Sequence, residues 1–395
     1  MEIFIQKRRK TMLKVSVIGI GNAGGQVAAK AAENLNVPAM AINSSEKDLG
    51  TIAGNVMKRV ITDKEGLGQG AGKNRSLAKK YLKDSIIKML SDKEVNSFIS
   101  DNDVVFIVSS TGGGTGSGAA PLMTSILSST FVDIKFIMVG ITPVNSEALS
   151  AQVNSLEYLK EVYDILQNQT YMIYDNEKMS DLPSYQMMGE INDEIVKDID
   201  VIRCAHNNPT PYDSIDEEDM SRLISFPGLL NIVRLDNIKE KDVNTTSIED
   251  MLLKKLKSNA HVDFQRDKVI VATGVISNLE ENIANTFDNH IPKVVDYIGS
   301  PDHDFTHFSV HTNRGMENNI YLIMSGLSPI NDKVQAISDR IDQIQEKQKT
   351  AALEDHAMSI NVKDISSKIG KKDTRNVDHE AAEVDLANIF NMFEV

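Results

Sequence analysis

A run of glycine and hydroxyl residues between an apolar segment and a helical pattern most constrains how this chain can fold. The run is Thr111-Gly112-Gly113-Gly114-Thr115-Gly116-Ser117-Gly118, and the apolar residues 104–108 precede it. Such an apolar run is typical of a buried strand, and residues 119–123 have the composition of a helix start. Glycine lets the backbone approach a ligand closely, and the free N–H groups of a helix N-terminus attract anions. The order of strand, glycine loop and helix therefore predicts a phosphate-binding site.

The first two thirds of the chain alternate β-branched apolar runs with helical patterns. Chains of this kind fold as a parallel sheet covered by helices, so we predict the α/β class. The expected strands are residues 14–20, 39–43, 104–109, 133–141 and 171–174, and the expected helices are 25–34, 76–90, 119–128 and 146–166. Residues 185–205 carry isoleucines at helical spacing and predict a long connecting helix.

A second, smaller α/β domain is expected to follow the connecting helix. Its predicted elements are strands at 267–276, 304–310 and 319–325 and a helix over 280–297, with a short acidic helix at 214–224 ahead of them. A long charged helix is expected from residue 329 to about residue 357, with a narrow stripe of isoleucine and valine.

Composition limits the class of function. The chain has 395 residues, a formal net charge of −14 and a pI of about 5.1, so its body should repel nucleic acid. Cys204 is the single cysteine, which excludes an internal disulfide and predicts a reducing, cytoplasmic setting. No apolar run is long enough to span a membrane. Lys7-Arg8-Arg9-Lys10 is a basic exception, which either a solvated extension or a phosphate-contacting arm would explain.

A second glycine motif, Gly19-Ile20-Gly21-Asn22-Ala23-Gly24, follows the first predicted strand. The same spacing marks dinucleotide-binding domains, which use an acidic residue at the end of the second strand to hold the ribose. Here that strand ends in Asn43-Ser44-Ser45, and the first acid is displaced to Glu46. The sequence therefore disfavours a dinucleotide-dependent oxidoreductase, which is the alternative from another functional class.

A third glycine-rich stretch, Gly66-Leu67-Gly68-Gln69-Gly70-Ala71-Gly72-Lys73, is not a P-loop. Leu67 stands where the first P-loop glycine belongs, and Asn74 replaces the Ser or Thr that binds Mg²⁺. Taken alone, this stretch has a mobile surface loop as its alternative interpretation.

In order and content these loops resemble the nucleotide loops of the tubulin/FtsZ family of GTPases. The resemblance extends over about residues 14–345 and implies that family's fold, GTP or GDP as the ligand, and hydrolysis assisted by Mg²⁺. The nucleotide contacts that it implies for these loops come from Gly21, Asn22, Ala23, Asn43, Gly70, Gly112, Gly113, Gly114, Thr115, Gly116 and Ser117.

Two further stretches resemble the parts of the family that contact base and ribose. Asp175-Asn176-Glu177 is similar to the tubulin form of the base-reading loop; without the other loops it would be read as a helix cap. An Asn side chain offers one acceptor and two donors, which suit a guanine edge. The resemblance therefore implies base contacts from Asn176 and from Asn192 on the following helix, and a ribose contact from Glu147. Ala151 replaces an Arg that the division proteins carry.

Residues 227–236 resemble the family's seventh loop, with which one subunit completes the active site of the next. The family pattern places acids two and five residues after an Asn. Asn231 and Asp236 match it, but Val233 occupies the earlier acid position, so Asp236 is expected to orient the attacking water alone. Taken alone, this spacing would be read as turn chemistry.

No metal-ligating residues are predicted in the protein itself. His303, His307 and His311 have the spacing of three ligands on a helix, but their segment alternates like a strand.

The resemblance implies a GTPase that polymerises head to tail into filaments. The net charge of −14, the long C-terminal helix and the departures at Val233 and Ala151 favour the plasmid- and phage-borne branch that segregates DNA. In that branch the expected partner is a separate DNA-binding adaptor at the C-terminal region, so that DNA is bound only indirectly. A bacterial cell-division ring GTPase and a non-hydrolysing filament are the alternatives, and Asp236 disfavours the second.

The expected divisions are an N-terminal extension (1–13), a GTP-binding domain (14–184), the connecting helix with the seventh loop (185–247), the second α/β domain (248–330), the C-terminal helix (331–358) and a flexible tail (359–395). The tail ends in four apolar residues at helical spacing, namely Leu386, Ile389, Phe390 and Phe393. They predict either a docking peptide for a partner or packing back onto the same chain.

Overall fold

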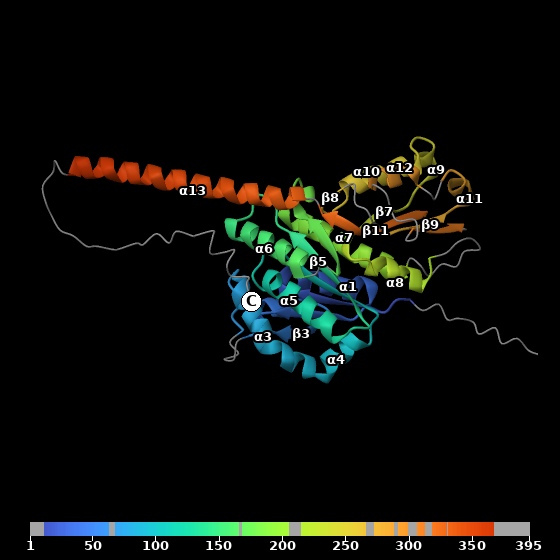
Figure 1. Ribbon diagram of the computed structural model, residues 1–395, viewed down its shortest axis with the longest axis horizontal. Helices are drawn as coiled ribbons and strands as arrows, with labels where there is room; N and C mark the ends of the chain where they lie inside the picture. Colours follow the sequence, from blue (N-terminus) through green and yellow to red (C-terminus); the bar gives the residue numbers. More distant parts are fainter. Residues whose placement is uncertain are drawn as a thin grey trace, which may run out of the picture. The chain divides into compact units, whose positions relative to one another are not determined.

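One mixed sheet organises the first part of the computed structural model (Figure 1). The structure describes residues 12–62, 68–165, 168–204, 215–265, 272–287, 291–298, 306–312, 318–329 and 331–366. The chain divides into two units, Met1–Asp342 and Gln343–Val395, and the sheet belongs to the first. The predicted α/β class is confirmed. The basic N-terminal run and the four apolar residues of the tail lie outside the described residues.

The sheet has eleven strands in the order β10-β9-β11-β7-β6-β5-β4-β1-β2-β3, and β8 pairs with β11 beside this path. The strands are β1 (Val15–Ile20), β2 (Ala39–Asn43), β3 (Met57–Val60), β4 (Val104–Ser110), β5 (Lys135–Thr142), β6 (Thr170–Asp175), β7 (Gly228–Leu235), β8 (Phe264–Gln265), β9 (Ala272–Leu279), β10 (Thr306–Thr312) and β11 (Asn319–Pro329).

The helices fill the connections between these strands. They are α1 (Gly21–Leu35), α2 (Glu46–Thr51), α3 (Arg75–Ser91), α4 (Lys93–Ser100), α5 (Thr115–Thr130), α6 (Leu149–Ile165), the 3-10 helix η1 (Asn176–Met179), α7 (Ser184–Cys204), α8 (Glu217–Ser225), α9 (Glu240–Val243), α10 (Ile248–Ser258), α11 (Glu281–Ala284), α12 (Pro292–Ile298) and α13 (Asn331–Ser366). None of the described helices combines the length and apolar character needed to cross a bilayer.

Six parallel strands, β1 to β6, form the half of the sheet predicted from the apolar runs. β1 lies between β2 and β4, and each successive pairing is parallel. Every residue of β1, β2 and β6 is buried, as expected for a parallel sheet covered on both faces. The five strands predicted for this half are confirmed, with ends shifted by no more than two residues.

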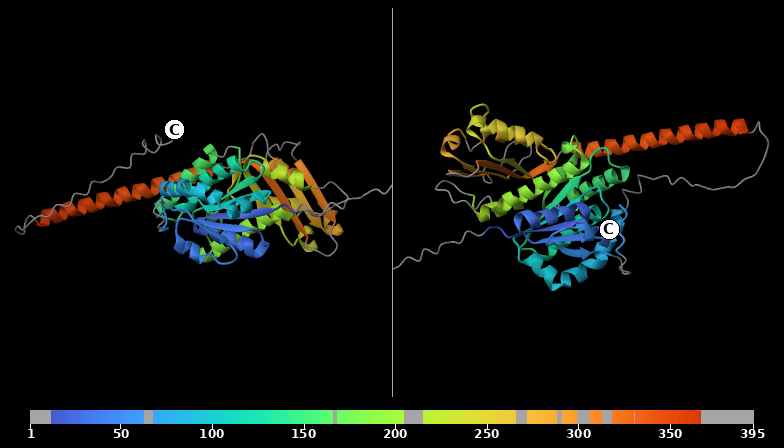
Figure 2. Two further views of the ribbon diagram at one scale, coloured as in Figure 1. Left: turned by 90° about the horizontal axis from the view of Figure 1, so that it is seen from below. Right: turned by 180° about the vertical axis from the view of Figure 1, so that it is seen from behind.

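The two faces of the parallel half carry separate cores. α3, α5 and α6 cover one face, where Ile18 and Ile20 of β1 point, whereas α1 and α7 cover the other face with Val15 and Val17 (Figures 1 and 2). Successive residues of a strand point to opposite faces, so one apolar strand supplies both cores. The predicted connecting helix is confirmed as α7, whose four isoleucines are all buried.

The remaining strands are joined to the parallel half at one place. β7 runs parallel to β6 but pairs with it only at Thr170↔Gly228 and Tyr171↔Leu229. On its other side, β7 is antiparallel to β11 from Leu229 to Leu235, and β11 in turn is antiparallel to β9. The predicted division at residue 248 stays a prediction, because the sheet continues through this junction.

Two expectations for this region are wrong. The helix predicted over 280–297 is two short helices, α11 and α12, because Pro292 begins the second one and disfavours helical backbone at the residue before it. Residues 228–235, predicted as a loop, form β7. The short acidic helix at 214–224 is confirmed as α8, although it begins and ends slightly later.

A buried polar cluster attaches α7 to the sheet. Asp198 on α7 accepts hydrogen bonds from Arg234 Nε (2.6 Å), His261 Nε2 (2.9 Å) and Tyr174 Oη (2.7 Å). Arg234 also pairs with Glu194 of α7 at 2.6 Å. Burial alone would raise the pKa of Asp198, but the bond from His261 and the charge of Arg234 outweigh burial and lower that pKa below its usual value.

Asp198→Asn should lower the free energy of unfolding at neutral pH by about 3 kcal/mol, because it leaves buried Arg234 without one of its carboxylates. The folded-state pKa of Asp198 is depressed, so its contribution is complete above the unfolded value of about pH 4 and is lost as pH falls through the folded value. Urea unfolding of wild type and variant should therefore converge in acid. Asp84→Asn, at an exposed position of α3, is the control and should leave stability unchanged.

Candidate functional site

The carboxyl ends of the parallel strands meet at one edge of the sheet. The connections that leave this edge are β1–α1, β2–α2, β3–α3, β4–α5, β5–α6 and β6–η1. In open α/β sheets ligands bind in the crevice outside these strand ends. All of the loops predicted from glycine, Asn and Ser patterns begin here, so the candidate site is this edge.

The glycine run 112–114 leads directly into α5, whose first residue is Thr115. A Cβ on Gly113 would meet nothing within 4 Å, so the backbone of this residue is open to a ligand. A Cβ on Gly114 would lie 2.6 Å from Lys73 Cα, which shows how closely the third glycine stretch approaches this loop. The start of α5 therefore presents free N–H groups to an anion.

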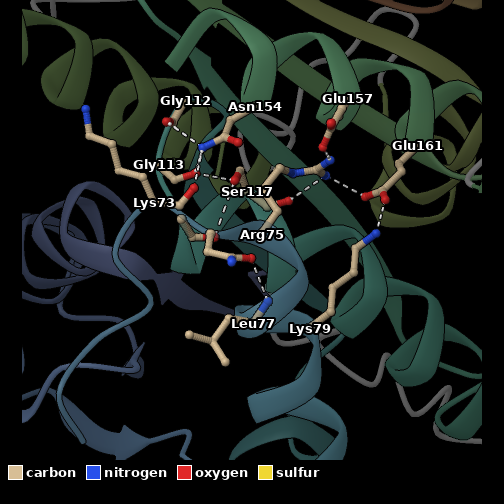
Figure 3. Close-up of polar contacts among 12 residues, drawn as sticks. Lys73, Arg75, Leu77, Lys79, Gly112, Gly113, Ser117, Asn154, Glu157 and Glu161 are labelled. Carbon is tan, nitrogen blue, oxygen red and sulfur yellow. Dashed lines mark hydrogen bonds and ion pairs between the residues drawn. The ribbon is translucent and has the colours of Figure 1, made fainter. Parts of the chain in front are cut away.

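Asn154 on α6 holds these two loops together (Figure 3). Its Nδ2 donates to the carbonyl oxygens of Lys73 (3.0 Å), Gly112 (3.3 Å) and Gly113 (2.9 Å). The hydroxyl of Ser117 is buried and donates to the carbonyl of Gly113, and the predicted contact of this residue with the nucleotide stays a prediction. Ser117 and Asn154 therefore hold the backbone of the glycine loop in place.

Arg75, the first residue of α3, follows the third stretch and is held by several polar contacts (Figure 3). Its guanidinium is buried and bonds Glu157 (2.8 Å), Glu161 (2.6 Å) and the carbonyl of Ser117 (3.0 Å). Lys79 is a second partner of Glu161. An Arg fork held by two carboxylates is a rigid support, and it fixes the start of α3 against α5 and α6.

The loops that follow β1 and β2 also contact the glycine run. Gly21 has φ +78°, and a Cβ there would lie 3.1 Å from Gly116 N. Asn22 is exposed and Ala23 is half-buried in the first turn of α1. Ser44 Oγ lies 2.6 Å from Thr115 Oγ1, which joins the second loop to the start of α5.

The second and third loops are bonded to each other through their backbones. Gly70 N donates to Ser44 O at 2.8 Å, and Glu46 N donates to Gly68 O at 3.0 Å. Asn43 is buried and accepts a bond from Ser45 N at 3.3 Å. The structure thus brings together at one edge every residue predicted on these loops.

The end of β6 contains an unpaired acceptor. Asp175 caps η1 by accepting from Glu177 N at 3.1 Å, so the helix-cap interpretation of Asp175 is confirmed. Asn176 follows it, and its Oδ1 is buried with no donor within reach among the described residues. An acceptor of this kind is costly unless a ligand satisfies it, which fits the N–H groups of a guanine edge. Asn192 lies half-buried on α7.

Glu147 lies in the exposed β5–α6 connection. Its Oε1 accepts from Val144 N at 3.2 Å, so in this structure the carboxylate closes its own turn. Ala151, which replaces the Arg of the division proteins, is buried on α6.

The two residues predicted as catalytic lie elsewhere. Asn231 is within β7, 1% exposed, and its Oδ1 accepts from Asn259 Nδ2 at 2.7 Å. Asp236 follows the end of β7, with a side chain 43% exposed and 3.5 Å from Arg234 Nη1. The geometry gives Asn231 a structural contact, and the role of Asp236 stays a prediction.

Comparison with known proteins identifies the family that this part of the chain matches. Residues 14–183 match the model described as the GTPase domain of the Tubulin/FtsZ family. The chain carries a tubulin/FtsZ-family GTPase domain. That span contains the loops of the candidate site from Gly21 to Asn176.

Relatives of this GTPase domain differ in how much of the chain they cover. The tubulin-like protein CetZ of Pyrococcus abyssi is 28% identical over 201 residues, which is 47% of this chain and 52% of that protein. The tubulin-like protein TubZ of Bacillus cereus is 23% identical over 387 residues, or 88% of this chain and 86% of that protein. The chain therefore spans about half the length of the CetZ relative and most of the TubZ relative.

Solved structures of the tubulin/FtsZ family share the fold. A GTPγS-form protofilament of Bacillus thuringiensis serovar israelensis TubZ has a TM-score of 0.70 at 18% identity, covering 89% of this chain and 94% of that chain. The phage c-st TubZ of Clostridium botulinum has a TM-score of 0.65 at 18% identity, covering 85% of this chain and 99% of that chain.

The family pattern of acids also fits a second segment, which the sequence reading missed. Asp216 and Asp219 are three residues apart, as the two acids of the seventh loop are, and Ser214 stands where that pattern has Asn. Asp216 is the N-cap of α8, and each side chain of the pair accepts a bond from the other residue's backbone. The signal was the Asp-x-x-Asp spacing itself, which was read as part of an acidic helix.

The acid pair lies at the opposite edge of the sheet from the glycine loops. Asp216 and Glu218 line a cleft of about 480 Å³ together with Leu13, Asp103 and Lys135, which stand before or at the starts of β1, β4 and β5. The amino and carboxyl edges of the tubulin/FtsZ-type sheet therefore carry different functional groups.

The described residues contain no cluster of three or more His, Cys, Asp or Glu side chains that could hold a metal. His303 lies outside the described residues, and His307 and His311 belong to β10, as the alternating pattern predicted. Any Mg²⁺ at this site would depend mainly on phosphate oxygens and water.

Asn154→Leu should loosen the glycine loops even without a ligand, because it removes the donor shared by three carbonyls. The cost of an unsatisfied buried group is about 1–3 kcal/mol, so amide exchange in residues 68–74 and 112–117 should accelerate about 5- to 150-fold. Asn96→Leu, exposed on α4, is the control and should leave these loops unchanged. Unaltered exchange in Asn154→Leu would contradict the proposed clamp.

Proposed function

We propose that this protein binds and hydrolyses GTP and assembles head to tail into filaments. The observation that carries the proposal is the convergence of six loops at the carboxyl edge of the sheet, where the buried Oδ1 of Asn176 is also found. Glycine backbone and the start of α5 suit the phosphates, and the Asn176 acceptor suits the guanine edge. Asn192 and Glu147 are the further candidates for base and ribose.

The chemistry would be in-line attack of water on the γ-phosphate of GTP. Such transfer is catalysed mainly by positioning and by stabilising charge, which the N–H groups at residues 113–117 would supply. Mg²⁺, when bound with the phosphates, would neutralise part of the developing charge. The chain's own part is therefore to hold the phosphates rigidly, and the Asn154 and Arg75 contacts serve that rigidity.

The water-orienting acid would come from the next subunit. A head-to-tail stack along the strand direction brings the amino edge of one sheet over the carboxyl edge of another. Asp216 and Asp219 stand at the amino edge, which supports this pair as the inserted acids.

Asp236, the acid expected from the sequence, is the alternative. It lies at the far end of β7 from Gly228, which is beside the start of β6, and eight strand residues span roughly 23–26 Å.

Assembly is supported by the relatives of the same fold. TubZ of Bacillus thuringiensis and CetZ2 of Haloferax volcanii have both been solved as protofilaments with a GTP analogue. The match to TubZ over 88% of this chain supports the segregation branch, with DNA reached through an adaptor protein at the C-terminal region. The net charge of −14 accords with indirect contact to DNA.

A role in cell division is the second candidate. Cell division protein FtsZ 1 of Methanocaldococcus jannaschii is 28% identical over 183 residues, which is 44% of this chain. Location of a tagged protein decides between the two roles, since segregation predicts filaments that follow a plasmid or phage genome and division predicts a ring at midcell.

GTP should bind at least 100-fold more tightly than ATP, because adenine reverses the donor and acceptor pattern at the edge that Asn176 would read. Direct titration calorimetry with both nucleotides measures the ratio. Asn176→Leu should reduce GTP affinity and narrow that ratio, whereas Asn96→Leu should change neither. Equal affinities of the wild-type protein would exclude the guanine assignment.

Hydrolysis should depend on assembly, with specific activity rising above a threshold protein concentration. Asp216→Asn combined with Asp219→Asn should lower the rate by roughly two orders of magnitude or more, as removal of a transition-state contact does. Asparagine keeps an N-cap acceptor, so α8 should persist. Glu218→Gln, in the same helical turn, is the matched control.

GTP affinity of the double variant should equal that of wild type, since the acids would act on the neighbour's nucleotide. Its filaments should therefore form and persist. Asp236→Asn, measured in the same assay, distinguishes the two candidates for the catalytic acid. If hydrolysis is lost in Asp236→Asn and kept in the double variant, Asp236 is the catalytic acid and the pair Asp216 and Asp219 is not. Full activity of dilute monomer would reject the shared active site altogether.

A further inference from the structure

We infer that Lys333, on the first turns of α13, is a positioning residue for the base-reading loop, so that nucleotide binding and the seating of α13 are coupled. The inference rests on the proposed function and adds a regulator of the same site. The base-reading loop is defined here as residues 175–177, between β6 and η1.

The first contact is an ion pair to the residue before Asn176. Lys333 Nζ lies 2.7 Å from Asp175 Oδ1, and the two side chains are only 14% and 10% exposed. The same oxygen accepts from the Thr142 hydroxyl at 2.9 Å and from Glu177 N at 3.1 Å. One carboxylate oxygen thus joins α13, the end of β5 and the cap of η1.

The second contact comes from Arg340, further along α13. Arg340 Nε donates to Asn145 O at 2.9 Å, and Asn145 N donates to Glu177 Oε2 at 2.7 Å. Arg340 therefore contacts the β5–α6 connection, which contains Glu147 and is bonded to the base-reading loop through Asn145 N. Two separate cations of α13 converge on the base and ribose end of the site.

Apolar packing fixes α13 at the same place. Ile337 and Ile341 are buried and belong to the core that covers the α3, α5 and α6 face of the sheet, and Val334 packs against that core. Their spacing places them on one side of the helix, in the same turns that carry Lys333 and Arg340. The described part of α13 up to residue 342 is therefore docked by both polar and apolar contacts.

These contacts link the binding of guanine at Asn176 thermodynamically to the docking of α13. A guanine bound at Asn176 stabilises the loop geometry that Asp175 needs for Lys333, and the docked helix in turn preorganises Asn176. Lys333 bonds Asp175 and Arg340 bonds Asn145, both at the base and ribose end of the site. Removal of Lys333 should therefore weaken GDP and GTP equally, since both carry the same base.

The test is titration of GDP into the full-length protein, kept below the concentration at which it assembles. Lys333→Met should weaken GDP binding about 5- to 150-fold, the usual range of a coupling between sites. Lys333→Arg should recover most of the affinity, because it restores a cation that reaches Asp175. Lys347→Met removes the same charge from an exposed position of the same helix and should bind GDP as wild type does.

A second measurement needs no variant. GDP added to the wild-type protein should slow amide exchange in residues 331–342, and this protection should be absent in Lys333→Met. Wild-type GDP affinity in Lys333→Met, or exchange in residues 331–342 that GDP leaves unchanged, would overturn the inference. A wild-type protein that binds no guanine nucleotide would instead refute the proposed function.

Discussion

The parallel pairing of β1 with β2 and β4, and of β5 with β4 and β6, is the constraint on which the site depends. Parallel strands must all end at the same edge, so loops that are far apart in the chain are forced into contact there, as Ser44 and Thr115 are across 71 residues. Burial of apolar residues on both faces holds these strands in register. The loops themselves contribute little to that register and are free to carry glycine and hydroxyl residues instead.

Polar groups buried beneath the loops then determine their exact geometry. Arg75 and Asp198 are charged groups almost fully removed from water, and burying such groups is costly unless partners surround them. Each has at least three close partners drawn from different elements. Breaking one contact leaves another charge unsatisfied, so these clusters favour a single arrangement of α3, α5 and α6, and of α7 on the sheet. Rigid loops are what positional catalysis of phosphoryl transfer requires.

The two edges of the sheet differ in chemistry in a way that suits head-to-tail assembly. The carboxyl edge has backbone donors and a buried amide acceptor, whereas the amino edge has a cleft lined by acids beside α8. Among the described residues, the nucleotide loops lie at the carboxyl edge, whereas Asp216 and Asp219 lie at the amino edge. In the proposed filament each subunit would therefore supply half of a site. α13 adds contacts to the carboxyl edge through Lys333 and Arg340.

The sequence by itself determined the elements whose signals are local. The apolar runs before glycine loops, the isoleucine spacing of α7 and the Asp175 cap all depend on neighbours within a few residues, so these were predictable. Only the tertiary structure decided that 228–235 is a strand, because its partner β11 lies some 90 residues later. It likewise decided the contacts of Asn154 and Lys333, whose partners are 81 and 158 residues away. A hydrogen bond across such a separation leaves no periodic trace in the sequence, since it is created by the register of the sheet and by burial.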